Sequence, residues 1–560
     1  MLRRLRWSEL DAAARAALID RSLENGITPA LREQIGELLE DVRQHGDDAV
    51  CRALARFDGV DVDPDGLAVG EAEFAEARAA VDGQLHAAIV DMIDHIRRFN
   101  EALMERTADW TFETDPGLWV GEKITPIASA GLFCPSGKAS YPSVLAQIGT
   151  PATVAGVGNV AVVVPPKPGA NGKVDPVVLT VAAELGLTQV FRANGPAGVA
   201  ALGFGTARIP KVVKIVGPGS WPVTCAQVEM QRWGTATMMA LGPTESVVIA
   251  DDSADPVRLA ADLLIEAEHG TDSCTLLITP SASLLETVDA ELERQTLELP
   301  APRAEAARSS LGVNGGGVLV EDLIEATEVA NAFASEHLQV AVATDAVDEV
   351  VRRLLHAGEI LIGQDTPFSA ANFLIGCPAS LPTNGFARVS SGITVDAFLK
   401  RTAVARLERG VATVVAEHRR ARRGRGVPRS RRGTAAALSA RLTRSVRRRG
   451  GPTMPGAGSS RPGRGPLAGR SSAIDAVSLR STAASDGPKP RNAAVRARLR
   501  WPCVNTTTAP GPSALTSLTN RWARIITSPG DSPPGQPSRH SSHAGWDCRI
   551  SLVRSPSYSP

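Results

Sequence analysis

The sequence predicts an α/β fold with two similar parallel-sheet halves, an N-terminal helical segment and a disordered basic C-terminal tail. Three observations lead to this prediction. Charged and apolar residues recur at helical spacing in the first 110 residues, and short apolar runs alternate with helical stretches between about 125 and 405. After about residue 419 the composition shifts abruptly to Arg, Pro, Ser, Gly and Ala. With 560 residues, the chain is long enough for two or more domains that each bury a core.

Residues 1–124 are predicted to form the helical segment. From about residue 8 to 110, apolar side chains recur every three or four residues, as they do in residues 31–39. Residues 1–11 are charged and lack the apolar stretch of a secretory signal. The chain has no run of roughly 18 apolar residues that could span a membrane, and its seven cysteines form no CxxC pair. These features predict a soluble, cytoplasmic protein without a membrane partner.

Two further segments, residues 125–240 and 241–405, are predicted to be similar Rossmann-like α/β domains. Their strand candidates are nearly continuous apolar runs that end at Gly or Pro, and helices separate them. Runs of this kind predict parallel sheets covered on both faces. In the first domain, strands are expected at 130–133, 160–164 and 213–216, with a helix at 176–185. After Pro243 the pattern restarts, with a helix at about 255–268 and strands at 246–250, 274–278, 317–320, 338–342 and 359–362.

The last segment, residues 406–560, is predicted to be a low-complexity tail rich in Arg, Pro and Ser. After His418 the chain contains 27 Arg or Lys and four acids, whereas the first 418 residues contain 33 basic and 56 acidic side chains. Basic runs at 419–425 and 447–449 could contact phosphate backbones. Because the tail has little to bury, we interpret it as disordered and expect no nucleic-acid partner. A shifted reading frame in GC-rich DNA would produce the same bias, in which case this tail replaces another C-terminus.

The pair Glu336-His337 is the strongest chemical signal in the chain. A carboxylate beside an imidazole provides two proton-transfer groups that work near neutral pH, although most adjacent Glu-His pairs are solvated surface. A second acid-rich segment, residues 266–270, contains His269. His269 should follow a helix, and Glu336-His337 should directly precede a strand. Because ligands of open parallel sheets bind beyond the carboxyl ends of the strands, we expect both groups to face one cleft between the halves.

Seven segments of the chain occur in the order that they have in a known enzyme family. They are GLFCPSGKASYPS at 131–143, KIVGPG at 214–219, GPTE at 242–245, AEHGTDS at 267–273, SEHL at 335–338, LPTNGFAR at 381–388 and SSG at 390–392. In these segments, residues 8 to about 405 resemble histidinol dehydrogenase. The resemblance implies NAD-dependent, zinc-assisted oxidation of a primary alcohol through the aldehyde to the carboxylate. L-histidinol, in histidine biosynthesis, is then the default substrate of a homodimer with one zinc per subunit.

The resemblance also implies a set of site residues. Glu336 and His337 take the catalytic positions, where the acid helps to activate water and the imidazole moves protons at the substrate oxygen. The zinc-ligand positions fall on Glu266, His269 and Asn372. The substrate-binding positions fall on Thr244, Glu266, His269, His337 and Asn372. The NAD-binding positions fall on Phe133, Ala197 and Ser220.

Several of these positions depart from the family's pattern. Asn372 offers a neutral oxygen where the family has an Asp, which weakens zinc binding. The family's C-terminal His ligand has no match, since the nearby His418 is out of register. Phe368 replaces a substrate-binding Glu, and residues 378–379 (Pro-Ala) replace an Asn-His pair. Two alternatives therefore stay open: a paralogue that oxidises a smaller or less cationic alcohol, and a folded homologue that has lost turnover.

Overall fold

The computed structural model of the chain describes residues 1–21, 26–135, 141–238, 242–408 and 410. The expected tail, apart from its first few residues, therefore lies outside the described residues. Met1–Phe112 and Val120–Ala405 belong to one compact unit, which contains both large sheets. Among the described residues, no helix is both long and apolar enough to cross a membrane.

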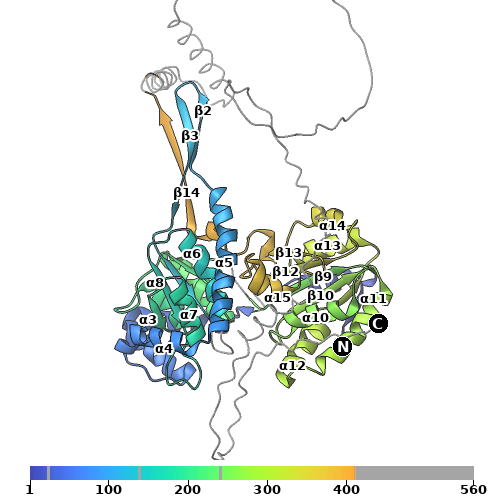
Figure 1. The fold of residues 1–560 in the computed structure, drawn as a ribbon, viewed down its shortest axis with the longest axis horizontal. Helices are drawn as coiled ribbons and strands as arrows, with labels where there is room; N and C mark the ends of the chain where they lie inside the picture. The colour runs from blue at the N-terminus through green and yellow to red at the C-terminus, as the bar shows by residue number, and fades with distance from the viewer. Residues whose placement is uncertain (22–25, 136–140, 239–241, 409, 411–560) are drawn as a thin grey trace, which may run out of the picture. The chain divides into compact units, whose positions relative to one another are not determined.

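The first large sheet has five strands in the order β6-β5-β4-β7-β8, and every pair in it is parallel. Seven helices pack around it (Figure 1). The strands are β4 (Ala130–Phe133), β5 (Val160–Val164), β6 (Val190–Arg192), β7 (Lys214–Val216) and β8 (Ala236–Thr237). The helices are α3 (Pro29–Ala53), α4 (Glu71–Ala80), α5 (Gly83–Glu105), α6 (Pro142–Val154), α7 (Pro176–Glu184), α8 (Gly195–Phe204) and α9 (Trp221–Met230).

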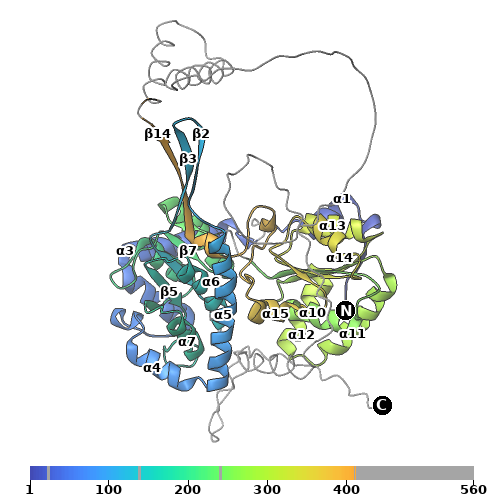
Figure 2. The same ribbon diagram turned by 45° about the horizontal axis from the view of Figure 1, so that its top comes forward.

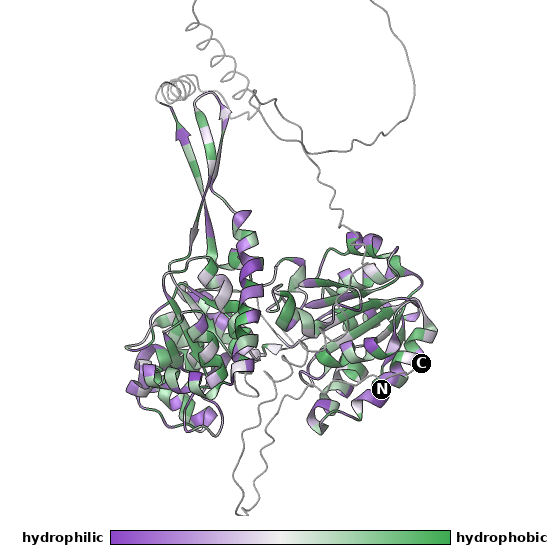
Figure 3. Cartoon of the chain, viewed as in Figure 1, coloured by the Kyte–Doolittle hydropathy of each residue, from purple (hydrophilic) through white to green (hydrophobic). Residues whose placement is uncertain are grey.

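Alternate residues of the first sheet enter two separate apolar cores. Leu132 and Val162 pack with α4, α5, α6 and α7 on one face, and Ala161 and Val163 pack with α3, α8 and α9 on the other. This division follows from the two-residue period of a strand. Figure 3 shows the hydrophobic residues concentrated along the strands of both large sheets. Continuous apolar runs at 130–133 and 160–164 therefore do mark strands that are buried on both faces, as predicted.

The second large sheet has six parallel strands in the order β1-β11-β10-β9-β12-β13. Figure 2 shows helices on both of its faces. If β1 is left out, the strands of the second sheet follow one another in the same relative order as those of the first sheet. In both sheets the strand that comes first in the sequence, β4 or β9, lies in the centre. The prediction of two similar parallel-sheet halves is thus confirmed. The strands are β1 (Arg4–Arg6), β9 (Glu245–Ala250), β10 (Cys274–Thr279), β11 (Gly316–Leu319), β12 (His337–Ala341) and β13 (Glu359–Ile362). The helices are α1 (Ala12–Ile19), α10 (Pro256–Ala267), α11 (Ala282–Thr296), α12 (Ala301–Ser309), α13 (Leu323–Phe333), α14 (Val347–Arg353) and the short α15 (Phe368–Ala370).

A small third sheet, in the order β14-β3-β2, combines β2 (Trp110–Asp115) and β3 (Leu118–Pro126) with β14 (Leu399–Leu407). Every residue of β2 is exposed, and so is nearly all of β14. The apolar pattern of the sequence predicted no strands here, because a strand exposed on both faces has no apolar side to reveal it.

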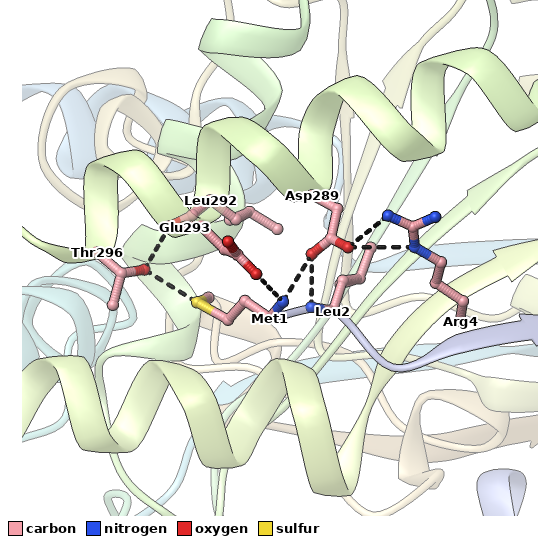
Figure 4. A network of polar contacts seen from close by, with 7 residues as sticks. All are labelled: Met1, Leu2, Arg4, Asp289, Leu292, Glu293 and Thr296. Carbon is pink, nitrogen blue, oxygen red and sulfur yellow. Dashed lines mark hydrogen bonds and ion pairs between the residues drawn. The ribbon is translucent and has the colours of Figure 1, made fainter.

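The N-terminus is anchored to the second sheet, which the sequence also did not predict. Strand β1 pairs with β11. The carboxylate of Asp289 on α11 accepts hydrogen bonds from three groups in the first residues of the chain (Figure 4). The Met1 amine lies 3.0 Å and the Leu2 amide 2.7 Å from its Oδ1, and the Arg4 guanidinium bonds its Oδ2 at 2.7 Å. Asp289 is buried, whereas Glu293, which also bonds the amine, is 67% exposed.

Asp289→Ala is expected to lower the free energy of unfolding by about 2–3 kcal/mol, because it leaves the buried backbone N–H of Leu2 without an acceptor and the charged Met1 amine with only Glu293. Glu293→Ala is the matched control on the same helix, and should cost about 0.5 kcal/mol or less, since its ion pair is exposed. Urea titration of the full chain measures both. Equal losses for the two variants would contradict the assignment of the anchor to Asp289.

Candidate active site

The site forms at the amino edge of the second large sheet. Glu245, His337 and Glu359 are the first residues of β9, β12 and β13. Because β9 and β10 are parallel neighbours, α10 must return from the carboxyl edge to the amino edge between them. Its last turn, with Glu266, therefore reaches the edge at which these strands begin. The sequence analysis applied the rule that ligands of open parallel sheets bind beyond the carboxyl ends of the strands. The structure places Glu336-His337 at the amino ends instead.

His337 is held between two carboxylates. Its Nδ1 lies 2.5 Å from Oε1 of Glu359, and its Nε2 lies 3.8 Å from Oε1 of Glu336. The other oxygen of Glu336 accepts a hydrogen bond of 3.2 Å from the backbone N–H of Glu245. The ring of Phe368 meets the imidazole edge to face, with the centroids 5.8 Å apart. His337, Glu336 and Glu359 are exposed by only 3%, 9% and 9%, so bulk water is largely excluded from this array.

Burial and neighbouring charges shift the proton affinities of these groups. Burial, reinforced by the charges of Glu266 and Glu245, raises the pKa of Glu336 to about 8 against the opposing effect of His337. Burial opposes the imidazolium of His337, but the carboxylates of Glu266, Glu336 and Glu359 raise its pKa to about 10. Burial also raises the pKa of Glu245 to about 7. Perturbations of this size typically mark sites of proton transfer.

Acids outnumber cations in this region, and their oxygens are incompletely bonded. Oε2 of Glu245, Oε1 of Glu266 and Oε2 of Glu359 are all buried without a hydrogen-bond partner among the described residues. Opposing them are the imidazole of His337 and the guanidinium of Arg21, which lies 3.0 Å from Glu245 and 3.4 Å above the ring of Phe333. Buried acceptors without donors are costly. The arrangement therefore favours a ligand that carries positive charge and hydrogen-bond donors.

The predicted metal ligands are only partly brought together. Nδ1 of His269 lies 3.6 Å from Oε2 of Glu266, and Glu266 is close enough to Glu336 and His337 to shift their pKa values. The backbone carbonyl of Asn372 accepts a 3.4 Å bond from the side-chain amide of Gln147 on α6, and among the described residues no hydrogen bond or ion pair joins its side chain to Glu266 or His269. Within the described residues, no three His, Cys, Asp or Glu side chains could hold a metal ion together. Catalytic zinc takes three protein ligands, so these residues do not complete a zinc site.

The predicted substrate and cofactor residues lie in different surroundings. Thr244 directly precedes Glu245 and is half-buried, and its carbonyl accepts a bond of 3.0 Å from Cys274 N–H. Ser220 is exposed at the start of α9, and its hydroxyl makes no capping bond. Phe133 and Ala197 are 2% and 3% exposed, in the core that α3, α8 and α9 form with the first sheet. The roles of these residues stay predictions.

The carboxyl edge of the first sheet lies beside the start of a helix. Its strand order reverses between β4 and β7, and ligands of open sheets bind at the carboxyl ends of such neighbouring strands. Gly217 lies there with φ 143°, and a Cβ at this position would lie 2.1 Å from the carbonyl oxygen of Phe133. Residues 217–220 then lead into the N-terminus of the ten-residue helix α9. Backbone amides at a helix start can bind a phosphate, and NAD binding at this edge stays a prediction.

Sequence reasoning missed Glu359, Glu245 and Arg21. Glu245 stands in the GPTE segment but was not given a role, and Glu359 carries no motif. The signal that could have found the two acids is a carboxylate directly before an apolar strand run. Glu245 precedes the run at 246–250, and Glu359 precedes the run at 360–362. Acids at the starts of parallel strands lie at the same edge of the sheet. Glu245 and Glu359 could therefore have been predicted to lie near each other once both strands were assigned to one sheet.

The fold and this site define a class of protein, an α/β enzyme that moves protons at a buried acid–imidazole group. The model of the histidinol dehydrogenase family matches residues 24–421. Histidinol dehydrogenase from Synechocystis sp. is 40% identical over 380 residues, which cover 68% of this chain and 86% of that protein. A histidinol dehydrogenase homolog from Colwellia psychrerythraea is 36% identical over 420 residues, 74% of this chain and 91% of that protein.

Solved structures agree with the sequence comparisons. The crystal structure of histidinol dehydrogenase from Elizabethkingia anophelis superimposes with a TM-score of 0.70 at 27% identity, and the match covers 80% of this chain and 98% of that one. The chain belongs to the histidinol dehydrogenase family. It is therefore an NAD-dependent dehydrogenase of that type, and the resemblance found in the sequence is confirmed.

Proposed function

We propose that the chain oxidises L-histidinol through the aldehyde to the carboxylate, with NAD, in histidine biosynthesis. The observation that carries this proposal is the buried array Glu336–His337–Glu359 among carboxylate oxygens that have no partner. Histidinol is a primary alcohol with an ammonium group, so it combines a cation for the acids with a hydroxyl for the imidazole. Its positive charge would also offset the carboxylates that raise the pKa of His337, which makes the imidazole available as a base.

In the first oxidation, His337 accepts the hydroxyl proton as a hydride leaves the carbon. When bound, NAD supplies the acceptor for that hydride. In the second oxidation, ionised Glu336 takes a proton from the water that adds to the aldehyde, and His337, after releasing its first proton, removes a proton from the resulting hydrate as the next hydride leaves. This role requires the ionised form of Glu336, whose fraction rises as the pH passes its pKa of about 8. The low exposure of both side chains keeps competing water away and strengthens their electrostatic effect on the substrate.

Zinc does not enter this scheme, because the described residues supply only Glu266 and His269 as adjoining donors. We further propose a cytoplasmic homodimer. Size-exclusion chromatography with light scattering measures the assembly, and metal analysis of the purified protein measures zinc per subunit.

One observation favours a second candidate, oxidation of a less cationic alcohol. Phe368 is fully buried with its ring against His337, at a position where the family resemblance leads us to expect an acid. Replacing that acid with an apolar ring removes a partner for a substrate cation. The two candidates differ in the net charge of the alcohol that the site prefers.

NADH formation by the full chain tests the proposal, with L-histidinol, other amino alcohols and neutral diols compared by kcat/KM. We expect histidinol to be the best substrate and to yield two NADH per molecule. A neutral diol with a higher kcat/KM would support the second candidate instead. A folded protein that reduces no NAD with any alcohol of the panel would refute both.

A further inference from the structure

Glu359 is placed beside His337 by the register of the sheet. Strands β12 and β13 are parallel neighbours, and the register pairs His337 with Glu359 at the start of both strands. Side chains at paired positions of adjacent strands project from the same face. The carboxylate therefore meets the imidazole without any loop having to hold it, which explains the short 2.5 Å contact between Oε1 and Nδ1.

This contact determines which nitrogen of the imidazole can react. A carboxylate accepts hydrogen bonds, so the proton between the two groups belongs to Nδ1 and is donated to Glu359. Nε2 is then the nitrogen that faces Glu336, at 3.8 Å. The edge-to-face contact with Phe368 supports the same orientation of the ring. Without an acceptor at Glu359, the ring could turn about its χ2 angle and present the other nitrogen.

We propose that Glu359 is a positioning residue, which holds His337 in the tautomer and orientation that direct Nε2 toward Glu336 and the reacting hydroxyl. The proposal rests on the proposed function in one respect, that His337 is the group that exchanges protons with substrate. In this role Oε1 of Glu359 acts through the imidazole, and Oε2, which has no hydrogen-bond partner among the described residues, is not required to contact the substrate. An acid that orients a catalytic imidazole in this way also stabilises the imidazolium formed when the base takes a proton.

Glu359→Gln and Glu359→Met separate orientation from charge. Glutamine keeps an oxygen that accepts the Nδ1 proton, whereas methionine keeps the length of the side chain but offers no comparable acceptor. We expect kcat to fall about 10-fold in Glu359→Gln and about 100-fold in Glu359→Met, within the range for a misplaced proton-transfer group. The KM values for alcohol and NAD should change less than about threefold, because a residue that acts only through the imidazole affects the chemical step and not ligand binding.

Nitrogen NMR of protein labelled with ¹⁵N-histidine gives a readout that does not depend on turnover. The His337 resonances, assigned by their absence in His337→Asn, should indicate a protonated Nδ1 bonded to a carboxylate in the wild type. That signature should persist in weakened form in Glu359→Gln and disappear in Glu359→Met. A wild-type protein that shows the signature but reduces no NAD would refute the proposed function and leave the placement of His337 by Glu359 standing.

Glu73→Gln is the matched control, since Glu73 is a largely buried carboxylate that pairs with Arg192 in the first large sheet. It should lower the melting temperature without changing kcat. Glu359→Met with wild-type kcat and a lowered melting temperature would overturn the proposal in favour of a structural role. A large rise in the KM for alcohol at unchanged kcat would overturn it in favour of direct substrate contact.

Discussion

Glu336→Gln is expected to lower kcat for histidinol about 10²- to 10⁴-fold and, at the same time, to raise the melting temperature of the protein at pH 8. The loss of rate follows from removing the carboxylate that takes a proton from the attacking water. The gain in stability follows from removing an acid that is ionised in the unfolded chain but buried in the folded one. Glutamine retains an oxygen for the bond from Glu245 N–H, so the backbone contact is kept.

The pH dependence of this gain has a definite sign. Burial raises the pKa of Glu336 from 4.5 to about 8, so between these values the folded state binds a proton that the unfolded state has lost. The contribution of this carboxyl to stability is therefore fully present below pH 4.5 and is lost as the pH rises through about 8. The difference in melting temperature between Glu336→Gln and wild type should grow from pH 5 to pH 8.

Thermal melts across this pH range, together with NADH assays at each pH, measure both effects on the same samples. Asp58→Asn is the control, because burial also raises the pKa of Asp58 but its carboxylate bonds Asn194 in the first half of the chain. It should change the melting temperature without changing kcat. A Glu336→Gln protein that melts at a lower temperature than wild type and has normal turnover would remove Glu336 from the mechanism.

Most of the fold could be predicted because its strands are buried on both faces. The run at 160–164 is entirely apolar, and the structure has β5 at these residues with all five side chains buried. Strand β1 could not be predicted in the same way, since it is three residues long and two of them are exposed arginines. Its place in the sheet depends on Asp289, nearly 300 positions away, which no local pattern reveals.

The candidate site was predictable where chemistry coincides with a motif. Glu336-His337 and Glu266 stand in segments that resemble the family, and the structure brings their charges within reach of one another. Glu359 lies 22 residues from His337, and only the pairing of β12 with β13 brings the two together. Asn372 shows the reverse, because its position matches a ligand position but its contact is a backbone bond with Gln147. Residue matching predicts chemical type, whereas the direction of a side chain depends on tertiary packing.

His337→Asn is expected to lower kcat by about 10²- to 10⁴-fold, with its larger effect on the alcohol step. Asparagine can still donate a hydrogen bond to Glu359, so the buried carboxylate keeps a partner and the fold should persist. It has no nitrogen in the place of Nε2, and therefore cannot take the hydroxyl proton. Rates measured separately from histidinol and from the aldehyde distinguish the two oxidations. Glu336→Gln should slow the aldehyde step more, since that step requires water.

The double variant Glu336→Gln/His337→Asn tests whether the two side chains act in successive steps. Because the slower step then sets kcat, the double variant should be slower than the worse single variant by no more than about 10-fold. His86→Asn is the control, because His86 forms an exposed pair with Glu184 at 2.8 Å and should leave kcat within about twofold. If the two losses multiplied in full, Glu336 and His337 would be acting in the same step, and the separate roles assigned to them in hydration and in proton removal would be excluded.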